Sequence, residues 1–108
     1  IVNQQLTTTQ LDMITVPASK SYAVTNIMVC NNGSTPASFD MHFVPQSSSL
    51  SNAVTRVINT LELPVGETFT FDSERVVLEV GDKLSFVAEP DAGAGLTGLS
   101  ATVSYLEV

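Results

Sequence analysis

The stretch Ala37-Ser-Phe-Asp-Met-His-Phe-Val44 decides the fold class of this chain. Apolar side chains occupy every second position from Phe39 to Phe43, and polar side chains stand between them. Successive side chains of a β-strand point to opposite faces, so this alternation predicts a strand with one buried face and one polar face. The stretch Glu67-Thr-Phe-Thr-Phe-Asp72 repeats the pattern. We therefore expect an antiparallel β protein.

The same alternation continues along the chain, and breaks rich in Pro, Gly, Asn or Ser interrupt it at short intervals. Such spacing is typical of two packed sheets. We predict an all-β fold: a single antiparallel β-sandwich of about eight strands, jelly-roll-like, with an immunoglobulin-like sandwich as the alternative. Five phenylalanines are expected in its core: Phe39, Phe43, Phe69, Phe71 and Phe86. The expected strands span residues 11–16, 21–30, 37–44, 54–63, 67–72, 76–80, 83–89 and 99–106.

A length of 108 residues predicts one domain. Residues 1–10 are rich in Thr and Gln and have no regular period, so we expect an extended N-terminal arm, with the β-sandwich spanning residues 11–108. A frayed terminus and an arm that docks on a neighbour are equally compatible with this stretch. The expected strand 21–30 is apolar on both sides, which predicts a central strand covered on both faces.

The charge balance argues against nucleic acid as a direct partner. The net charge is −7, and the four basic residues are too few and too scattered to neutralise a row of phosphates. Eight of the 11 acidic residues lie between Glu62 and Asp91. This acidity indicates solubility and resistance to self-association, with steering toward a basic partner or a weak cation site as the alternatives.

Cys30 is the single cysteine, so the chain forms no internal disulfide. Its apolar neighbours predict a small buried side chain. Because small secreted domains usually carry paired cysteines, a lone cysteine favours assembly inside a cell. No apolar run approaches the roughly 18 residues of a membrane span, so we expect no membrane association.

Little in the sequence indicates catalysis. His42 is the single histidine, and the predicted strand places it on the outward face beside Asp40, as a surface or interface residue. One His and one Cys do not complete a zinc site, and no loop has the spacing of a calcium site. No helix follows Gly93, Gly95 and Gly98, which indicates a flexible loop tip rather than a phosphate site. We expect no enzyme activity, no cofactor and no metal.

Four phrases carry a resemblance to a known family: Lys20-Ser-Tyr-Ala-Val-Thr-Asn-Ile-Met-Val-Cys-Asn31, Phe39-Asp-Met-His-Phe-Val44, Leu63-Pro-Val-Gly-Glu-Thr-Phe-Thr-Phe-Asp72 and Val80-Gly-Asp-Lys-Leu84. From about residue 16 to residue 108 the chain resembles small β-sandwich virion proteins of tailed bacteriophages, particularly marine and cyanobacterial phages. The resemblance implies a structural protein of the particle, assembled in the bacterial host cytoplasm and located in the virion. It leaves open which part of the particle the protein occupies.

We therefore expect a capsid decoration (cement) protein that binds the major capsid protein, or another virion protein, at capsomer junctions and stabilises the shell. A homo-oligomer, trimer or dimer, is expected. The arm Ile1–Thr9 and the loop Pro45–Ala53 are the expected contact segments, through strand addition or buried apolar anchors. The candidate interface residues are Ile1, Val2, Leu6, Leu50, Tyr22 and His42.

Two alternatives remain open at the level of the sequence. The first is a virion module of the tail, collar or fibre. The second is a receptor- or carbohydrate-binding β-sandwich that uses Tyr22, His42 or the Gly93–Gly98 loop, because sugar-binding modules stack exposed aromatic rings on their ligands.

Overall fold

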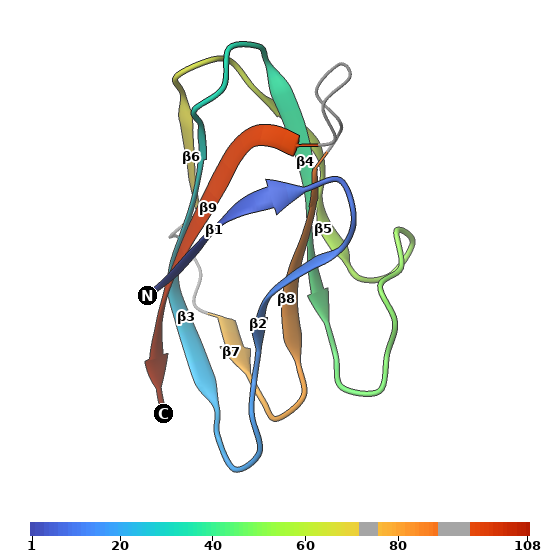
Figure 1. Cartoon of the computed structure of the whole chain (residues 1–108). Coiled ribbons are helices and arrows are strands. Elements are labelled where there is room, and N and C mark those ends of the chain that lie inside the picture. The colour runs from blue at the N-terminus through green and yellow to red at the C-terminus, as the bar shows by residue number, and fades with distance from the viewer. Residues whose placement is uncertain (72–75, 89–95) are drawn as a thin grey trace.

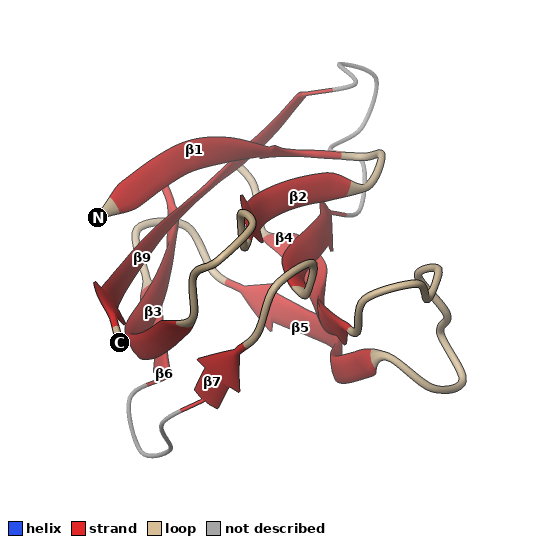
Figure 2. Ribbon diagram, turned by 90° about the horizontal axis from the view of Figure 1, so that it is seen from below, coloured by secondary structure: helices blue, strands red, loops and turns tan. Residues whose placement is uncertain are grey.

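The computed structural model describes residues 1–71, 76–88 and 96–108. Within these residues nine strands form two antiparallel sheets that pack face to face (Figure 1). Figure 2 shows the two layers from below, with loops joining strands of one layer to strands of the other. The predicted all-β sandwich is confirmed.

Sheet A has the strand order β1-β9-β3-β6, and the short β7 also pairs with β3. Sheet B has the order β2-β8-β4-β5. The strands of sheet A are β1 (Val2–Thr7), β3 (Tyr22–Asn31), β6 (Thr68–Phe71), β7 (Val76–Leu78) and β9 (Leu96–Glu107). Those of sheet B are β2 (Leu11–Thr15), β4 (Ala37–Val44), β5 (Arg56–Leu63) and β8 (Lys83–Ala88).

The pairing scheme identifies the jelly roll. The strands β6 and β7 pair with the two ends of β3, so together they act as one interrupted strand. With that strand counted once, the first strand pairs with the last, the second with the second-last, the third with the interrupted strand, and the fourth with the fifth. This nested pairing is the double-sheet jelly roll rather than the immunoglobulin order.

The core lies between the sheets and is built from alternate residues of both. Phe39 and Phe86 of sheet B are fully buried, with ring centroids 6.1 Å apart, and Phe39 also faces Phe69 of sheet A at 6.2 Å. Such tilted pairs suit the quadrupoles of aromatic rings. Of the five predicted core phenylalanines, Phe43, Phe69 and Phe71 are only partly buried and pack against the core from its rim.

The structure corrects the prediction of a separate N-terminal arm. Residues 2–7 are extended, as expected, but they form β1 and pair with β9 from Val2 opposite Val103 onward. The side chain of Leu6 is fully buried in the core cluster. A single buried leucine in a polar stretch gives no period, so the sequence pattern did not reveal this strand.

The last strand begins earlier than expected, at Leu96 rather than near residue 99. Gly98 lies within it, where a Cβ atom would come 2.4 Å from the Cα atom of Gly33. Glycine is therefore required for close backbone approach, and Gly98 is not part of a loop tip. Gly93 and Gly95, the rest of the predicted tip, lie outside the described residues.

We expect Leu6→Ala to lower the free energy of unfolding by about 2–5 kcal/mol, because it removes buried methyl groups and leaves a cavity. Urea unfolding followed by circular dichroism measures the change. Gln4→Ala is the control, since Gln4 is exposed on the same strand and its replacement should change stability by less than about 0.5 kcal/mol. Equal midpoints for the two variants would show that β1 does not contribute to the core.

Candidate functional site

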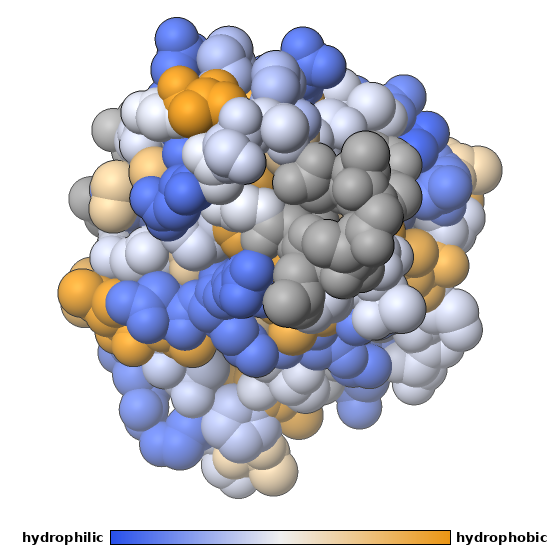
Figure 3. Space-filling model, turned by 45° about the horizontal axis from the view of Figure 1, so that its top comes forward, coloured by the Kyte–Doolittle hydropathy of each residue, from blue (hydrophilic) through white to orange (hydrophobic). Residues whose placement is uncertain are grey.

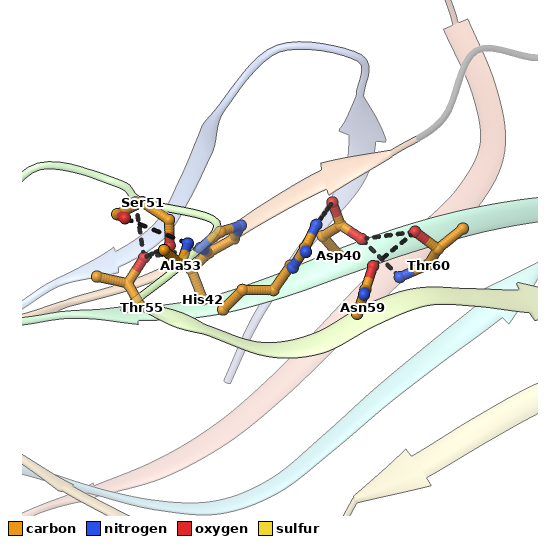
Figure 4. Close-up of polar contacts among 8 residues, drawn as sticks. Asp40, His42, Ser51, Ala53, Thr55, Asn59 and Thr60 are labelled. Atoms are coloured by element: carbon orange, nitrogen blue, oxygen red, sulfur yellow. Dashed lines mark hydrogen bonds and ion pairs between the residues drawn. The ribbon is translucent and has the colours of Figure 1, made fainter.

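A cluster of buried polar side chains lies on the outer face of sheet B (Figure 4). His42 points away from the core, yet it is fully buried. Its Nδ1 lies 2.8 Å from Oγ1 of Thr55, and the Thr55 hydroxyl donates to the carbonyl oxygen of Ser51 at 2.9 Å. Because the hydroxyl proton is used in that bond, we assign the ring proton to Nδ1, which donates to Thr55. The histidine thus anchors residues 51–55 to the sheet.

Burial lowers the pKa of His42 below its ordinary value of 6.5. The negative charge of Asp40 acts in the opposite direction, and the positive charge of Arg56 adds to the lowering. Nε2 of His42 has no hydrogen-bond partner within the part of the chain that the structure describes. A proton there would bring a positive charge into a buried position, so the ring is neutral at pH 7.

Asp40 stabilises an irregularity in the edge strand β5. Its Oδ1 accepts a hydrogen bond from the backbone N of Thr60 at 2.6 Å, and its Oδ2 lies 3.6 Å from Arg56. The strand register shifts beside Asp40, and Thr60 has a φ of 51°. Asp40 is 7% exposed. Its carboxylate therefore contacts the backbone at this β-bulge and the Arg56 guanidinium rather than solvent.

A second carboxylate on this face is also paired. Ser85 donates to Oδ1 of Asp12 at 2.7 Å, Gln10 donates to the same atom at 2.7 Å, and the ammonium of Lys83 lies 3.7 Å from Oδ2. Burial raises the pKa of Asp12, but these hydrogen bonds and the Lys83 charge outweigh it and hold the pKa below its usual value. Asp12, Asp40 and His42 therefore each hold a neighbouring segment of sheet B or its loop in place.

Sheet A differs from sheet B in its charge. The four strands of sheet B carry Asp12, Asp40, Arg56, Glu62 and Lys83. The five strands of sheet A contain one charged residue, Glu107, and it forms an ion pair with Lys20 at 2.8 Å. The folding pattern thus sorts the charged strand residues into one layer.

We call the outer surface of sheet A the uncharged face. Its residues alternate with those that enter the core: Asn3, Gln5, Ala23, Asn26, Met28, Cys30, Thr68, Thr70, Val77, Ser100, Thr102, Ser104 and Leu106. Protein surfaces usually carry about 25–35% charged residues, so a face of this size would be expected to hold about three or four. None of these residues, which belong to the described part of sheet A, is charged.

The uncharged face is mixed in polarity. It carries hydroxyl, amide and apolar side chains. A similar mixture is seen on the side of the molecule drawn in Figure 3, where hydrophobic residues form small separate groups among pale and hydrophilic ones. One cross-strand row is apolar: Val77 and Leu106 lie on either side of Ala23, and they are 54% and 60% exposed. Exposed apolar side chains at the end of a flat sheet suit contact with another protein surface.

The structure places the predicted N-terminal contact residues on and under β1. Ile1 is 82% exposed and available for contact. Val2 is half-buried and packs against the core, and Leu6 is fully buried. Leu6 is therefore a core residue of this chain rather than an anchor for a partner.

The other predicted contact residues do not come together. Tyr22 is half-buried, and its ring centroid lies 4.5 Å from that of Tyr105, so one part of the ring is covered by the other tyrosine. Leu50 is half-buried in the loop that follows β4. His42 is buried, which corrects the expectation of a surface histidine. Cys30 is half-buried on the uncharged face, which corrects the expectation of a buried thiol.

A small open pocket lies at the end of the sandwich, lined by Phe43, Val44, Pro45, Val76, Val77, Leu78 and Asp82. Asp82 is its one titratable lining group, and both carboxylate oxygens accept backbone hydrogen bonds, from Gln46 at 2.9 Å and Glu79 at 3.0 Å. Across the described residues, no cluster of three or more His, Cys, Asp or Glu side chains is placed to hold a metal ion. Nor does any helix there have the length and apolar character to cross a membrane.

No protein family, curated protein or solved structure matches this chain.

We predict that the stability of the protein falls as pH drops from about 7 to 5. The pKa of His42 is lower in the folded than in the unfolded chain, so its contribution is complete above 6.5 and is lost progressively below it. The stability that Asp12 contributes is present throughout this range and is lost only as pH falls below its ordinary pKa of 3.8, because its pKa is lowered in the folded chain. Urea unfolding of the wild type and of His42→Asn at each pH is the measurement. The variant should give a flatter profile over this range, and parallel profiles would contradict the assignment.

Asp40→Ala should lower the free energy of unfolding by about 1–3 kcal/mol, because it removes the buried carboxylate that accepts from the backbone N–H of Thr60 and faces Arg56. Chemical unfolding at pH 7 measures the change. Glu62→Gln is the matched control on the same pair of strands, since Glu62 is exposed. If the two variants were equally stable, the bulge would not depend on the carboxylate.

Proposed function

We propose that this chain is a non-enzymatic structural protein of a bacteriophage virion: a capsid decoration protein that binds the capsid surface at junctions between capsomers. The observation that carries the assembly role is the uncharged face of sheet A. The virion identity rests on the resemblance of residues 16–108 to small phage β-sandwich proteins.

The net charge of −7 favours contact through a surface without charge. A strongly acidic chain is repelled by other acidic surfaces, and each charge buried at an interface has to lose its water. A face without charge avoids both costs. Because the outer side of the central strand β3 presents Met28, 36% exposed, and the half-buried Cys30, covering it by another subunit also removes apolar surface from water.

The size of the face suits a specific contact. Four strands side by side, spaced by about 4.8 Å, and strands about 30 Å long present roughly 500 Å² on this chain. Contact with an equal area on a partner buries roughly 1,000 Å² in total, near the lower limit for a specific interface. Many copies on one particle add avidity to such a modest contact.

The jelly-roll fold is compatible with this role without establishing it. Double-sheet jelly rolls occur in viral capsid domains and in lectins, and a fold by itself does not set the function. The stacking of Tyr22 on Tyr105 and the burial of His42 favour the structural role over the sugar-binding alternative.

The direct test is electron cryo-microscopy of purified virions from a phage that encodes this chain, with mass spectrometry of their proteins. We expect many copies on the capsid, with sheet A toward the shell. Absence of the chain from the particle would refute the virion role. Density confined to the tail would replace decoration with the tail alternative.

A binding experiment tests the uncharged face. Thr102→Glu places a charge near the middle of the face and should weaken binding to capsids stripped of this protein by about tenfold or more, equivalent to about 1.4 kcal/mol. Ser48→Glu adds the same charge to an exposed loop residue after β4 and should bind as the wild type does. Equal binding of the two variants would exclude the face as the contact surface.

A further inference from the structure

The four sheet edges of this sandwich differ in how well they are protected against pairing with a strand of another chain. Edge strands with open hydrogen-bonding groups pair with other chains unless charges, bulges, proline or short length prevent it. The edge strand β5 has two register shifts, the left-handed Thr60, and the charges of Arg56 and Glu62. The edge strand β2 has a register shift and the charged Asp12, and Pro17 follows it closely.

The two edges of sheet A differ from each other. On one side the edge is divided between β6, with four residues, and β7, with three. On the other side β1 has six residues without charge or proline. Val2–Gln5 pair with β9 in unbroken register, and the one register shift lies at the end of the strand, between Gln5 and Thr7. Along the part of the chain that the structure describes, β1 has a strand neighbour on the β9 side alone. It is the least protected edge.

We propose that β1 pairs antiparallel with β1 of a second copy of this chain and extends sheet A across two molecules. This goes beyond the virion role, because it uses the strand edge rather than the uncharged face and does not depend on a particle.

The chemistry of β1 favours a second copy as the occupant. A charged strand would find no opposite charge on this edge, whereas β1 itself is an uncharged strand. Residues directly opposite each other in an antiparallel pair point to the same face, so a symmetric pair is centred on one residue. In the pair centred on Gln4, Gln4 lies opposite Gln4 of the partner. Its side chain is exposed, and its amide both donates and accepts hydrogen bonds. Amide ladders of this kind stabilise paired strands.

The net charge of −7 also favours contact between two copies through β1. Two copies repel each other where their acidic loops approach, and the repulsion is smallest where they meet through strands without charge. The two-fold axis of such a pair is perpendicular to the sheet. The uncharged faces of both copies therefore lie on one side of the dimer and form one continuous surface of twice the area.

The distance between the Cys30 residues of two copies distinguishes edge pairing from contact between the uncharged faces. Cys30 lies on β3, two strands from the β1 edge. Edge pairing places five strand spacings between the two Cys30 residues, which is about 24 Å or more. Contact between two uncharged faces would instead bring the sheets about 10 Å apart.

The test combines sedimentation velocity over a range of concentrations with electron–electron distance measurement on spin labels at Cys30. We expect a dimer with a label separation of about 24 Å or more. Gln4→Lys places two like charges beside each other across the new pair and should raise the dimer dissociation constant by about tenfold or more. Ser48→Lys, with the same charge change on an exposed loop residue, should dimerise as the wild type does.

Three results would overturn the proposal: a monomer at all concentrations, a dimer that Gln4→Lys does not weaken, or a label separation near the sheet-to-sheet spacing. Equal urea midpoints for Gln4→Lys and Ser48→Lys show that neither change unfolds the chain. Capsid binding tests the virion role separately, so a monomer that binds capsids would refute edge pairing alone.

Discussion

The pairing of β1 with β9 is the constraint on which the rest of this sandwich depends. It joins residues near position 2 to residues near position 103, and the next nested pair joins β2 to β8. Leu6 enters the core only because β1 is held in this register. Such long-range pairing requires closure of large loops before contacts form, so folding depends on many distant contacts at once. The chain then leaves β1 for β2 in the other sheet and ties the two layers together.

The two sheets use their outer faces differently. On sheet B, the carboxylates of Asp12 and Asp40 and the ring of His42 stabilise strand irregularities and the loop after β4. All three groups are hydrogen-bonded, and Asp40 and His42 are also buried, so they define local backbone geometry. On sheet A, alternate residues are small, hydroxylated, amidated or apolar, and the charge is confined to the end of β9. The function we propose follows from this difference between the faces.

Sheet A offers two different surfaces for contact with other molecules, the uncharged face and the β1 edge. The face offers area without charge, which suits a flat partner surface. The β1 edge offers backbone hydrogen bonds and the amides of Asn3 and Gln4, which suit an extended strand. Because the two lie next to each other in sheet A, edge pairing enlarges the face instead of covering it. A decoration protein with both properties would bind its particle through a surface built from two chains.

The sequence by itself determined the secondary structure class, because alternation such as that of residues 37–44 has only one regular backbone that buries Phe39 and Met41 together. It also bounded the chemistry, since one His and one Cys restrict the possible sites. Only the tertiary structure decided that His42 is buried, that Leu6 belongs to the core, and that the charges are sorted between the sheets. These outcomes depend on which strands become neighbours and which loops cover them. Strand pairing is set by contacts between distant residues, and the local period of a strand carries no information about its partner.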